Sequence, residues 1–113
     1  MKANADSWKR DPFVEGGEIL PLQLEISPEQ MERIKYGFIP QEMEDKWFAY
    51  YEEPFIYIHR SWTGMPVYRV EFGMSDSSIV VKEARLSKGY QGGNLRFEAD
   101  LAHHLLSGLM GAP

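Results

Sequence analysis

The segment 46–64, KWFAYYEEPFIYIHRSWTG, decides the fold that we expect for this chain. It contains seven of the chain's fifteen aromatic residues, and large apolar side chains recur at alternate positions on both sides of Glu53-Pro54. Aromatic residues fit the pleated, half-buried surface of a sheet, whereas proline fits a turn. The segment therefore predicts a β-hairpin that turns at Glu53-Pro54 and ends in a polar corner, HRSWTG, at residues 59–64.

Alternation also predicts strands on both sides of this hairpin. Leucines alternate with other residues over 19–26, and we place this strand at an edge of the sheet because Pro21 has no N–H to donate. Residues 67–72 and 79–86 alternate in the same way, and the turn sequence GMSDSS at 73–78 joins them. Short connections between successive strands are typical of an antiparallel meander.

Two helices are predicted from their capping residues. Ser27 precedes Pro28 at the first helical position, and Gln30 completes a capping box, so a helix begins there. We expect it to end at Gly37, because glycine tolerates the left-handed conformation that is common at helix ends. A second helix begins after Asn94, and its leucine-rich stripe predicts that it packs across the sheet.

Together these elements predict an α+β fold. We expect an antiparallel sheet of four to five strands in a meander, a short helix after the first strand, and a C-terminal helix packed on one face. The single domain spans residues 18–113. Residues 1–17 mix charged residues, Asn, Ser and Pro with a final Gly16-Gly17 pair, so we expect a flexible N-terminal arm.

Composition disfavours several classes of function. The formal net charge is −5 and the pI about 5.1, which argues against nucleic acid because proteins that bind its phosphates carry a surplus of Lys and Arg. The chain has no cysteine and hence no thiolate chemistry. It has no signal-peptide pattern and no stretch approaching the ~20 apolar residues that span a bilayer. We therefore expect a soluble cytoplasmic protein with no membrane partner and no cofactor.

The HRSWTG corner is the candidate site, because it gathers polar and aromatic groups within six residues. Arg60 offers a planar fork for a carboxylate or a phosphate, and Trp62 offers a face for a flat ligand. Lys46 adds a second cation if the fold places it beside Arg60. The predicted ligand-binding residues are Lys46, Trp47, Tyr50, His59, Arg60, Ser61, Trp62, Thr63 and Arg69.

An architectural role explains the same corner. A buried neutral histidine held by one hydrogen bond is commoner than a catalytic one, and we favour this structural role for His59. Ser61 and Thr63 can satisfy backbone groups through their hydroxyls, and Gly64 permits the turn. Trp62 would then bury a large apolar surface that fixes the turn.

A catalytic alternative rests on His59, Arg60 and Ser61. His59 and Ser61 would point the same way from one strand, so the imidazole could act as a base toward the hydroxyl. The chain contains no Gly-x-Ser-x-Gly nucleophile elbow, however. The enzyme alternative is therefore a small protein that acts on a phosphate- or carboxylate-bearing ligand.

Two further patterns carry weaker signals. Asp100, His103 and His104 are spaced to hold a metal from one helix, although such residues are more often a solvated helix flank. Residues 87–94, SKGYQGGN, precede a helix and could cradle a phosphate, but they do not meet the P-loop pattern and are typical of a flexible connector.

Segment 38–72 resembles the signature of a family of small, largely uncharacterised bacterial proteins. The matching residues are Lys46, Trp47, Phe48 and Tyr50 in a Lys-Trp-Phe-x-Tyr strand, residues 59–64 in His-Arg-Ser-Trp-Thr-Gly, and Tyr68, Arg69 and Val70 in a Tyr-x-Val strand. Similar segments occur in proteins named as ADP-ribosylglycohydrolases, so the resemblance implies ligands derived from NAD, such as ADP-ribose. The acidic metal-binding motifs of that hydrolase family are not in this chain, and the resemblance therefore carries over the signature without the activity.

The sequence favours a non-catalytic binding or interaction module over an enzyme. It contains no complete catalytic constellation, and aromatic residues and arginine are enriched at interfaces. The expected partner is an unknown protein or a small anionic ligand at the HRSWTG corner. We also expect that the chain can form a homodimer through an unpaired edge strand or through the sheet face that the C-terminal helix leaves uncovered.

Overall fold

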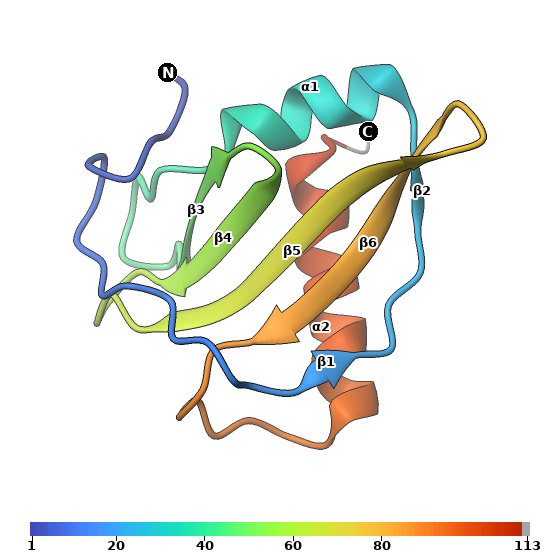
Figure 1. The fold of residues 1–113 in the computed structure, drawn as a ribbon. Helices are drawn as coiled ribbons and strands as arrows, with labels where there is room; N and C mark the ends of the chain where they lie inside the picture. The colour runs from blue at the N-terminus through green and yellow to red at the C-terminus, as the bar shows by residue number, and fades with distance from the viewer. Residues whose placement is uncertain (112–113) are drawn as a thin grey trace.

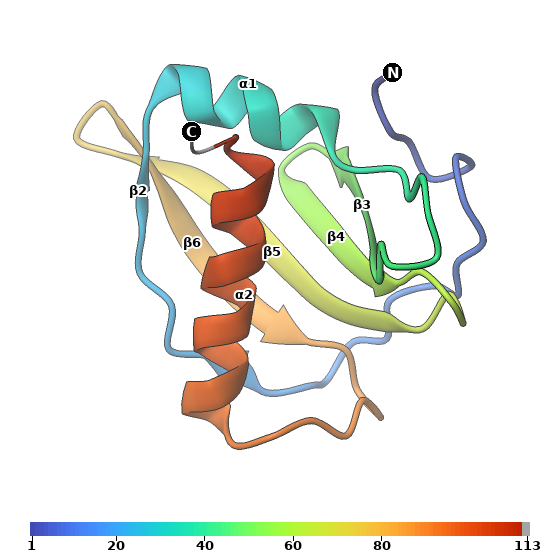
Figure 2. The same cartoon turned by 180° about the vertical axis from the view of Figure 1, so that it is seen from behind.

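One antiparallel sheet of six strands organises the computed structural model, which describes residues 1–111 (Figure 1). The elements are β1 (Ile19–Leu20), β2 (Glu25–Ile26), α1 (Pro28–Tyr36), β3 (Trp47–Glu52), β4 (Phe55–Arg60), β5 (Pro66–Ser75), β6 (Ser78–Leu86) and α2 (Leu95–Leu109). The strand order is β1-β6-β5-β4-β3, and β2 also pairs with β6. Figure 2 shows α2 crossing β5 and β6, whereas β3 and β4 lie beside it. The α+β class and the antiparallel meander from β3 to β6 are therefore confirmed.

The predicted hairpin forms between β3 and β4 and turns at Glu53-Pro54. In its register Trp47 pairs with Arg60, and Phe48 pairs with His59. Side chains alternate along a strand, so the two pairs lie on opposite faces of the sheet. Trp47 packs against the main core on the α2 side, and Phe48 belongs to a separate small core on the other side. His59 and Arg60 consequently serve different faces.

The N-terminal part of the sheet differs from the single strand predicted over 19–26. The structure splits it into β1 and β2, of two residues each, which both pair with β6. Pro21 has no N–H donor, and the Leu22 amide donates back to Leu20 O at 2.9 Å instead of extending the ladder. The prediction of four to five strands was wrong for this reason, and α1 follows the second strand rather than the first. The edge position is confirmed.

Both helices begin at the predicted caps. The Ser27 hydroxyl accepts from Gln30 N, and the Gln30 side chain accepts from Ser27 N, which completes the capping box. Gly37 follows α1 with a φ of 67°. The Asn94 side chain accepts a hydrogen bond of 2.9 Å from Phe97 N at the start of α2. Local capping chemistry therefore fixes the start of both helices.

The N-terminal arm, residues 1–17, lies along the sheet face opposite to α2 (Figure 1). Ala3 packs with Phe48 and Tyr50 in the small second core, and its amide donates to Tyr36 O at 2.8 Å. Further along the arm, the ring of Phe13 meets Tyr57 edge to face, with ring centroids 6.1 Å apart. The flexibility expected of this arm stays a prediction.

Candidate functional site

The corner between β4 and β5 is a tight turn closed by backbone hydrogen bonds. Arg60 N donates to Met65 O at 2.9 Å, and Gly64 N donates to Arg60 O at 2.8 Å. Gly64 has a φ of 79°, and a Cβ on this residue would lie 3.0 Å from Arg10 Cα. Glycine therefore fits both the backbone conformation and the close approach of the N-terminal arm.

The hydroxyls of the corner satisfy backbone groups, as the architectural interpretation predicts. The Ser61 side chain is 1% exposed, and its Oγ donates to Asp45 O at 2.6 Å. Thr63 Oγ1 accepts a 3.2 Å hydrogen bond from Met65 N. The arm adds a further contact, since Trp8 Nε1 donates to Ser61 O at 2.7 Å. These bonds tie the corner to the preceding loop and to the arm.

His59 is fully buried, with 0% of its surface exposed. Its Nε2 lies 2.9 Å from Asp11 O, and since a carbonyl can only accept, Nε2 carries the proton and donates. Nδ1 has no hydrogen-bond partner among residues 1–111. Burial lowers the pKa of His59, and the Asp11 carbonyl opposes this effect only in part. The neutral imidazole of His59 thus holds the N-terminal arm through its hydrogen bond to Asp11 O.

Trp62 is 60% exposed, so the expectation that it buries a large surface and plugs the corner was wrong. Its ring projects from the turn, and its Nε1 donates to Met43 O at 2.9 Å in the preceding loop. The position of Trp62 in the five-residue turn between β4 and β5 explains the exposure, because the core lies under the strands and not under the tip. Trp62 remains open to a ligand.

Tyr50 and Arg69 lie on the face that carries the arm. Tyr50 stacks on Tyr57 at 5.2 Å between ring centroids. The guanidinium of Arg69 lies over the Phe13 ring at 4.5 Å and forms a two-bond ion pair with Glu15. The hydrogen bond to Glu15 raises the pKa of Arg69, and the same bond lowers the pKa of Glu15. The Arg69 guanidinium is therefore already engaged by residues of the N-terminal arm.

On the α2 side, two cations face a shared cleft. Lys46, Arg60 and Trp62 line a hollow of about 100 Å³. The guanidinium carbon of Arg60 lies 5.0 Å from the centroid of the Trp47 ring, which is within reach of a cation–π contact. Neither Lys46 nor Arg60 forms an ion pair with a carboxylate of residues 1–111, whereas five other basic side chains do. These are Lys35, Arg69, Lys82, Arg85 and Arg96.

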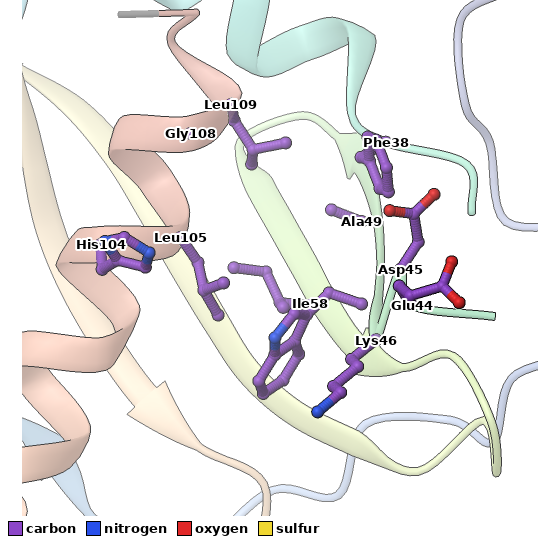
Figure 3. A pocket seen from close by; sticks show the side chains of 11 residues that line it. Phe38, Glu44, Asp45, Lys46, Ala49, Ile58, His104, Leu105, Gly108 and Leu109 are labelled. Atoms are coloured by element: carbon purple, nitrogen blue, oxygen red, sulfur yellow. The ribbon is translucent and has the colours of Figure 1, made fainter. Parts of the chain in front are cut away.

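A larger apolar groove adjoins this cleft. It has a volume of about 400 Å³ and lies between α2, the β3–β4 hairpin and the loop before β3. Figure 3 shows Phe38 and Leu109 at one end, Ile58 and Leu105 along the middle, and Lys46 at the other end. Trp47 also lines the groove, and Lys46 lines both hollows. The cationic cleft and the apolar groove therefore share a wall.

Three further polar side chains border the groove, and they are Glu44, Asp45 and His104. Asp45 is already occupied, because its Oδ2 accepts from Gln41 N at 2.9 Å and from Glu42 N at 3.1 Å. Glu44 and His104 are exposed. The border thus carries Lys46 as its one lysine or arginine in the part of the chain that the structure describes.

The residues predicted to bind a metal do not form a metal-binding cluster within residues 1–111. Asp100 lies on the exposed side of α2, where its Oδ1 is 3.7 Å from Arg96 Nε. His103 and His104 are also exposed. Within residues 1–111, the structure contains no group of three or more His, Asp or Glu side chains that could hold a metal ion.

Sequence reasoning missed a buried carboxyl group on α2. Glu98 is 1% exposed, and its Oε1 accepts from the Tyr68 hydroxyl at 2.5 Å while its Oε2 accepts from Gly93 N at 2.6 Å. Burial and the negative Glu98 together raise the pKa of Tyr68 strongly. Helical spacing in the sequence does indicate that this carboxyl group is buried, because Glu98 lies three residues after Leu95 and four before Ala102, inside the apolar stripe.

The predicted site residues therefore divide into three groups. Lys46, Trp47, Arg60 and Trp62 gather on the α2 side at the cleft and the groove. Tyr50, His59 and Arg69 lie on the opposite face beneath the arm. Ser61 and Thr63 hold the corner itself.

Comparisons with protein-family models, with curated proteins and with solved structures gave no match for this chain. In residues 1–111, neither helix combines the length and the apolar character needed to cross a membrane.

Proposed function

We propose that this protein is a non-catalytic binding module that holds an anionic group, a carboxylate or a phosphate, between Lys46 and Arg60. One observation carries the proposal: both cations line the same cleft, and no carboxylate within the described residues pairs with either. Five of the chain's twelve lysines and arginines form ion pairs within the described residues, and Lys46 and Arg60 are two unpaired ones that line one cleft together. Two adjacent cations without an acidic partner are therefore available to an anion from outside.

The two side chains would contribute in different ways. Arg60 presents a planar fork that can donate two parallel hydrogen bonds to one carboxylate or phosphate, and Lys46 adds a compact charge. The Trp47 ring under the guanidinium restricts its orientations before the ligand arrives. Less freedom is then lost on binding, which strengthens the complex.

Burial of His59 favours binding over catalysis. The enzyme alternative needs His59, Arg60 and Ser61 to face one substrate, but His59 lies beneath the arm on the other face of the sheet. Ser61 Oγ is already engaged with the Asp45 carbonyl. A ligand at Arg60 would meet neither group.

A homodimer through the free edge of β3 has less support than ligand binding. Phe38 N donates to Ala49 O at 2.9 Å, and Ala49 N donates to Phe38 O at 3.0 Å. This bridge occupies the middle of the outer edge of β3, where a second strand would have to pair.

The proposal can be tested by NMR titration at constant ionic strength with sulfate, inorganic phosphate and ADP-ribose. ADP-ribose is included because the resemblance of segment 38–72 points to ligands derived from NAD. We expect saturable shifts of the backbone amides of Lys46, Trp47 and Arg60. Arg60→Gln and Lys46→Gln should each weaken binding by about tenfold, since one charge-assisted hydrogen bond contributes ~1.5 kcal/mol or more.

Lys88→Gln serves as the matched control, because Lys88 is an exposed lysine outside the cleft and the groove. It should leave the affinity unchanged. If all three variants bind the anions as tightly as the wild type does, Lys46 and Arg60 do not form a site. The same conclusion follows if the chemical-shift changes of the wild type do not saturate.

A further inference from the structure

We infer that the anion held by Lys46 and Arg60 is the head of an amphipathic molecule with one negative charge, whose alkyl or acyl chain lies in the groove between α2 and the β3–β4 hairpin. This inference rests on the proposed function, and it adds the class of ligand. It follows from the position of the groove, from the charges along its border and from its size.

The groove exists because α2 covers β5 and β6 and leaves part of the hairpin without a helix above it (Figure 2). Its floor contains Ala49 and Ile58, and one wall contains Leu105 and Leu109 of α2. Phe38, at the end far from Lys46, is 40% exposed. Burial of apolar surface is favourable, so an apolar chain placed here would remove both its own surface and that of the groove from water.

The border of the groove has a cation at one end and apolar side chains at the other. Lys46 stands at one end and lines the cationic cleft as well as the groove, while Phe38 and Leu109 close the other end (Figure 3). A molecule with an anionic head and an apolar tail matches this order. Glu44 and Asp45 also border the groove, so a second negative charge on the ligand would weaken binding without preventing it. A carboxylate or a sulfate ester fits better than a phosphate monoester.

The size of the groove favours a small molecule over a protein segment. Its volume of about 400 Å³ lies at the lower end of the ~300–1,000 Å³ that is usual for small-molecule sites. A protein helix docked in a groove needs room for side chains over several turns. A single alkyl or acyl chain with a small head group needs less room.

Isothermal titration calorimetry with alkyl carboxylates of increasing length tests the inference directly. Butyrate, octanoate and decanoate should be compared with sulfate, decyl sulfate, decyl phosphate and decanol, all below their micelle-forming concentrations. We expect affinity to rise by up to about fourfold for each methylene group that the groove buries. Decyl sulfate should bind like decanoate, whereas decyl phosphate and decanol should bind more weakly.

A variant that fills the groove distinguishes the contribution of the ligand's alkyl chain from that of its anionic head group. Gly108 lines the groove, and a Cβ on this residue would meet no heavy atom within 4 Å. The Cβ of Gly108→Leu therefore meets no clash, and the substitution adds volume at the groove and raises helix propensity. It should abolish the dependence on chain length and leave sulfate binding intact. His103→Leu, which also places a leucine on α2 but on its exposed side, should leave both unchanged.

The outcomes distinguish the inference from the function on which it rests. If sulfate and butyrate bind at Lys46 and Arg60 but longer chains bind no better, or if Gly108→Leu has no effect on them, the groove is not the chain site and only the proposed function survives. If no anion binds, both fail. If the free protein sediments as a dimer that Gly108→Leu converts to monomer, a second copy occupies the groove and the inference is overturned.

Discussion

The guanidinium of Arg60 lies over the indole ring of Trp47, its cross-strand partner, at 5.0 Å from the ring centroid. The contact fixes a cation at the place where the cleft and the groove meet. The presence of a charge without an acidic partner among residues 1–111 is what relates this pair to ligand binding.

Removal of the indole should weaken anion binding even though the charge stays. A cation–π contact at an exposed site contributes ~0.5–1 kcal/mol, and Trp is the best of the aromatic partners. Trp47→Phe should therefore lower the affinity for sulfate by about two- to fivefold in the NMR titration. The matched control is Trp8→Phe, which changes a tryptophan outside the cleft and the groove and leaves the ring under Arg60 in place. Equal losses in the two variants would show that Trp47 does not orient the guanidinium.

Trp62→Ala should cost little stability, in contrast to most truncations of tryptophan. The ring is 60% exposed and makes one hydrogen bond, to Met43 O. We expect a loss of ~1 kcal/mol in the free energy of unfolding, measured with urea. Phe48→Ala, a truncation of a fully buried ring, should cost ~3–5 kcal/mol in the same assay. A similar cost for both would mean that the corner tryptophan is part of the core.

The buried carboxyl of Glu98 depends on the Tyr68 hydroxyl. Tyr68→Phe removes the donor to Oε1 and leaves only the Gly93 amide at Oε2. A buried acceptor without a partner costs ~1–3 kcal/mol, so the free energy of unfolding should fall by that amount. Tyr36→Phe changes an exposed ring in the same way and should have no measurable effect. If Tyr68→Phe is as stable as the wild type, the hydrogen bond does not stabilise the fold.

Acid should destabilise the protein through His59. Burial holds the pKa of His59 below the ordinary value of about 6.5, so in the window below that value the unfolded chain binds more protons than the folded one. The contribution of neutral His59 to the free energy of unfolding is then fully present above about pH 6.5, and it is lost as the pH falls toward the folded-state pKa of this residue. Urea unfolding between about pH 7 and 5 measures this slope.

Two exposed histidines provide the control for that slope. The double variant His103→Asn with His104→Asn should keep the loss of stability, because both rings are exposed in the structure. His59→Gln should remove it. A wild-type free energy of unfolding that stays flat across the window would contradict the burial of His59 as a neutral ring.

Local signals predicted much of the fold. The capping box at Ser27 and the Asn94 cap specify helix starts through contacts within four residues, and alternation specifies the hairpin strands. The break between β1 and β2 depends on how Pro21 interrupts a ladder with β6, a partner that lies about sixty residues away in the chain. Sequence periodicity does not report such a pairing.

The sequence indicated candidate residues for the site, but their arrangement in the fold could not be derived from it. Strand alternation alone separates His59 from Arg60 and keeps Arg60 beside Trp47. Burial at the corner could not be read in the same way, because it depends on which long-range segment covers each face. The N-terminal arm covers His59, and nothing in residues 1–111 covers Trp62 to the same extent. The groove likewise depends on where α2 crosses the sheet.

The most direct measurement of the central claim is a crystal structure of the protein grown with decanoate. We expect density for the carboxylate within hydrogen-bond distance of Lys46 Nζ and the Arg60 guanidinium, with the alkyl chain along Ala49, Ile58 and Leu105. Crystals of Arg60→Gln grown in the same solution should lack the head group at that place. Decanoate density elsewhere on the surface, with the cleft beside Trp47 occupied by solvent alone, would contradict the claim that Lys46 and Arg60 form the binding site.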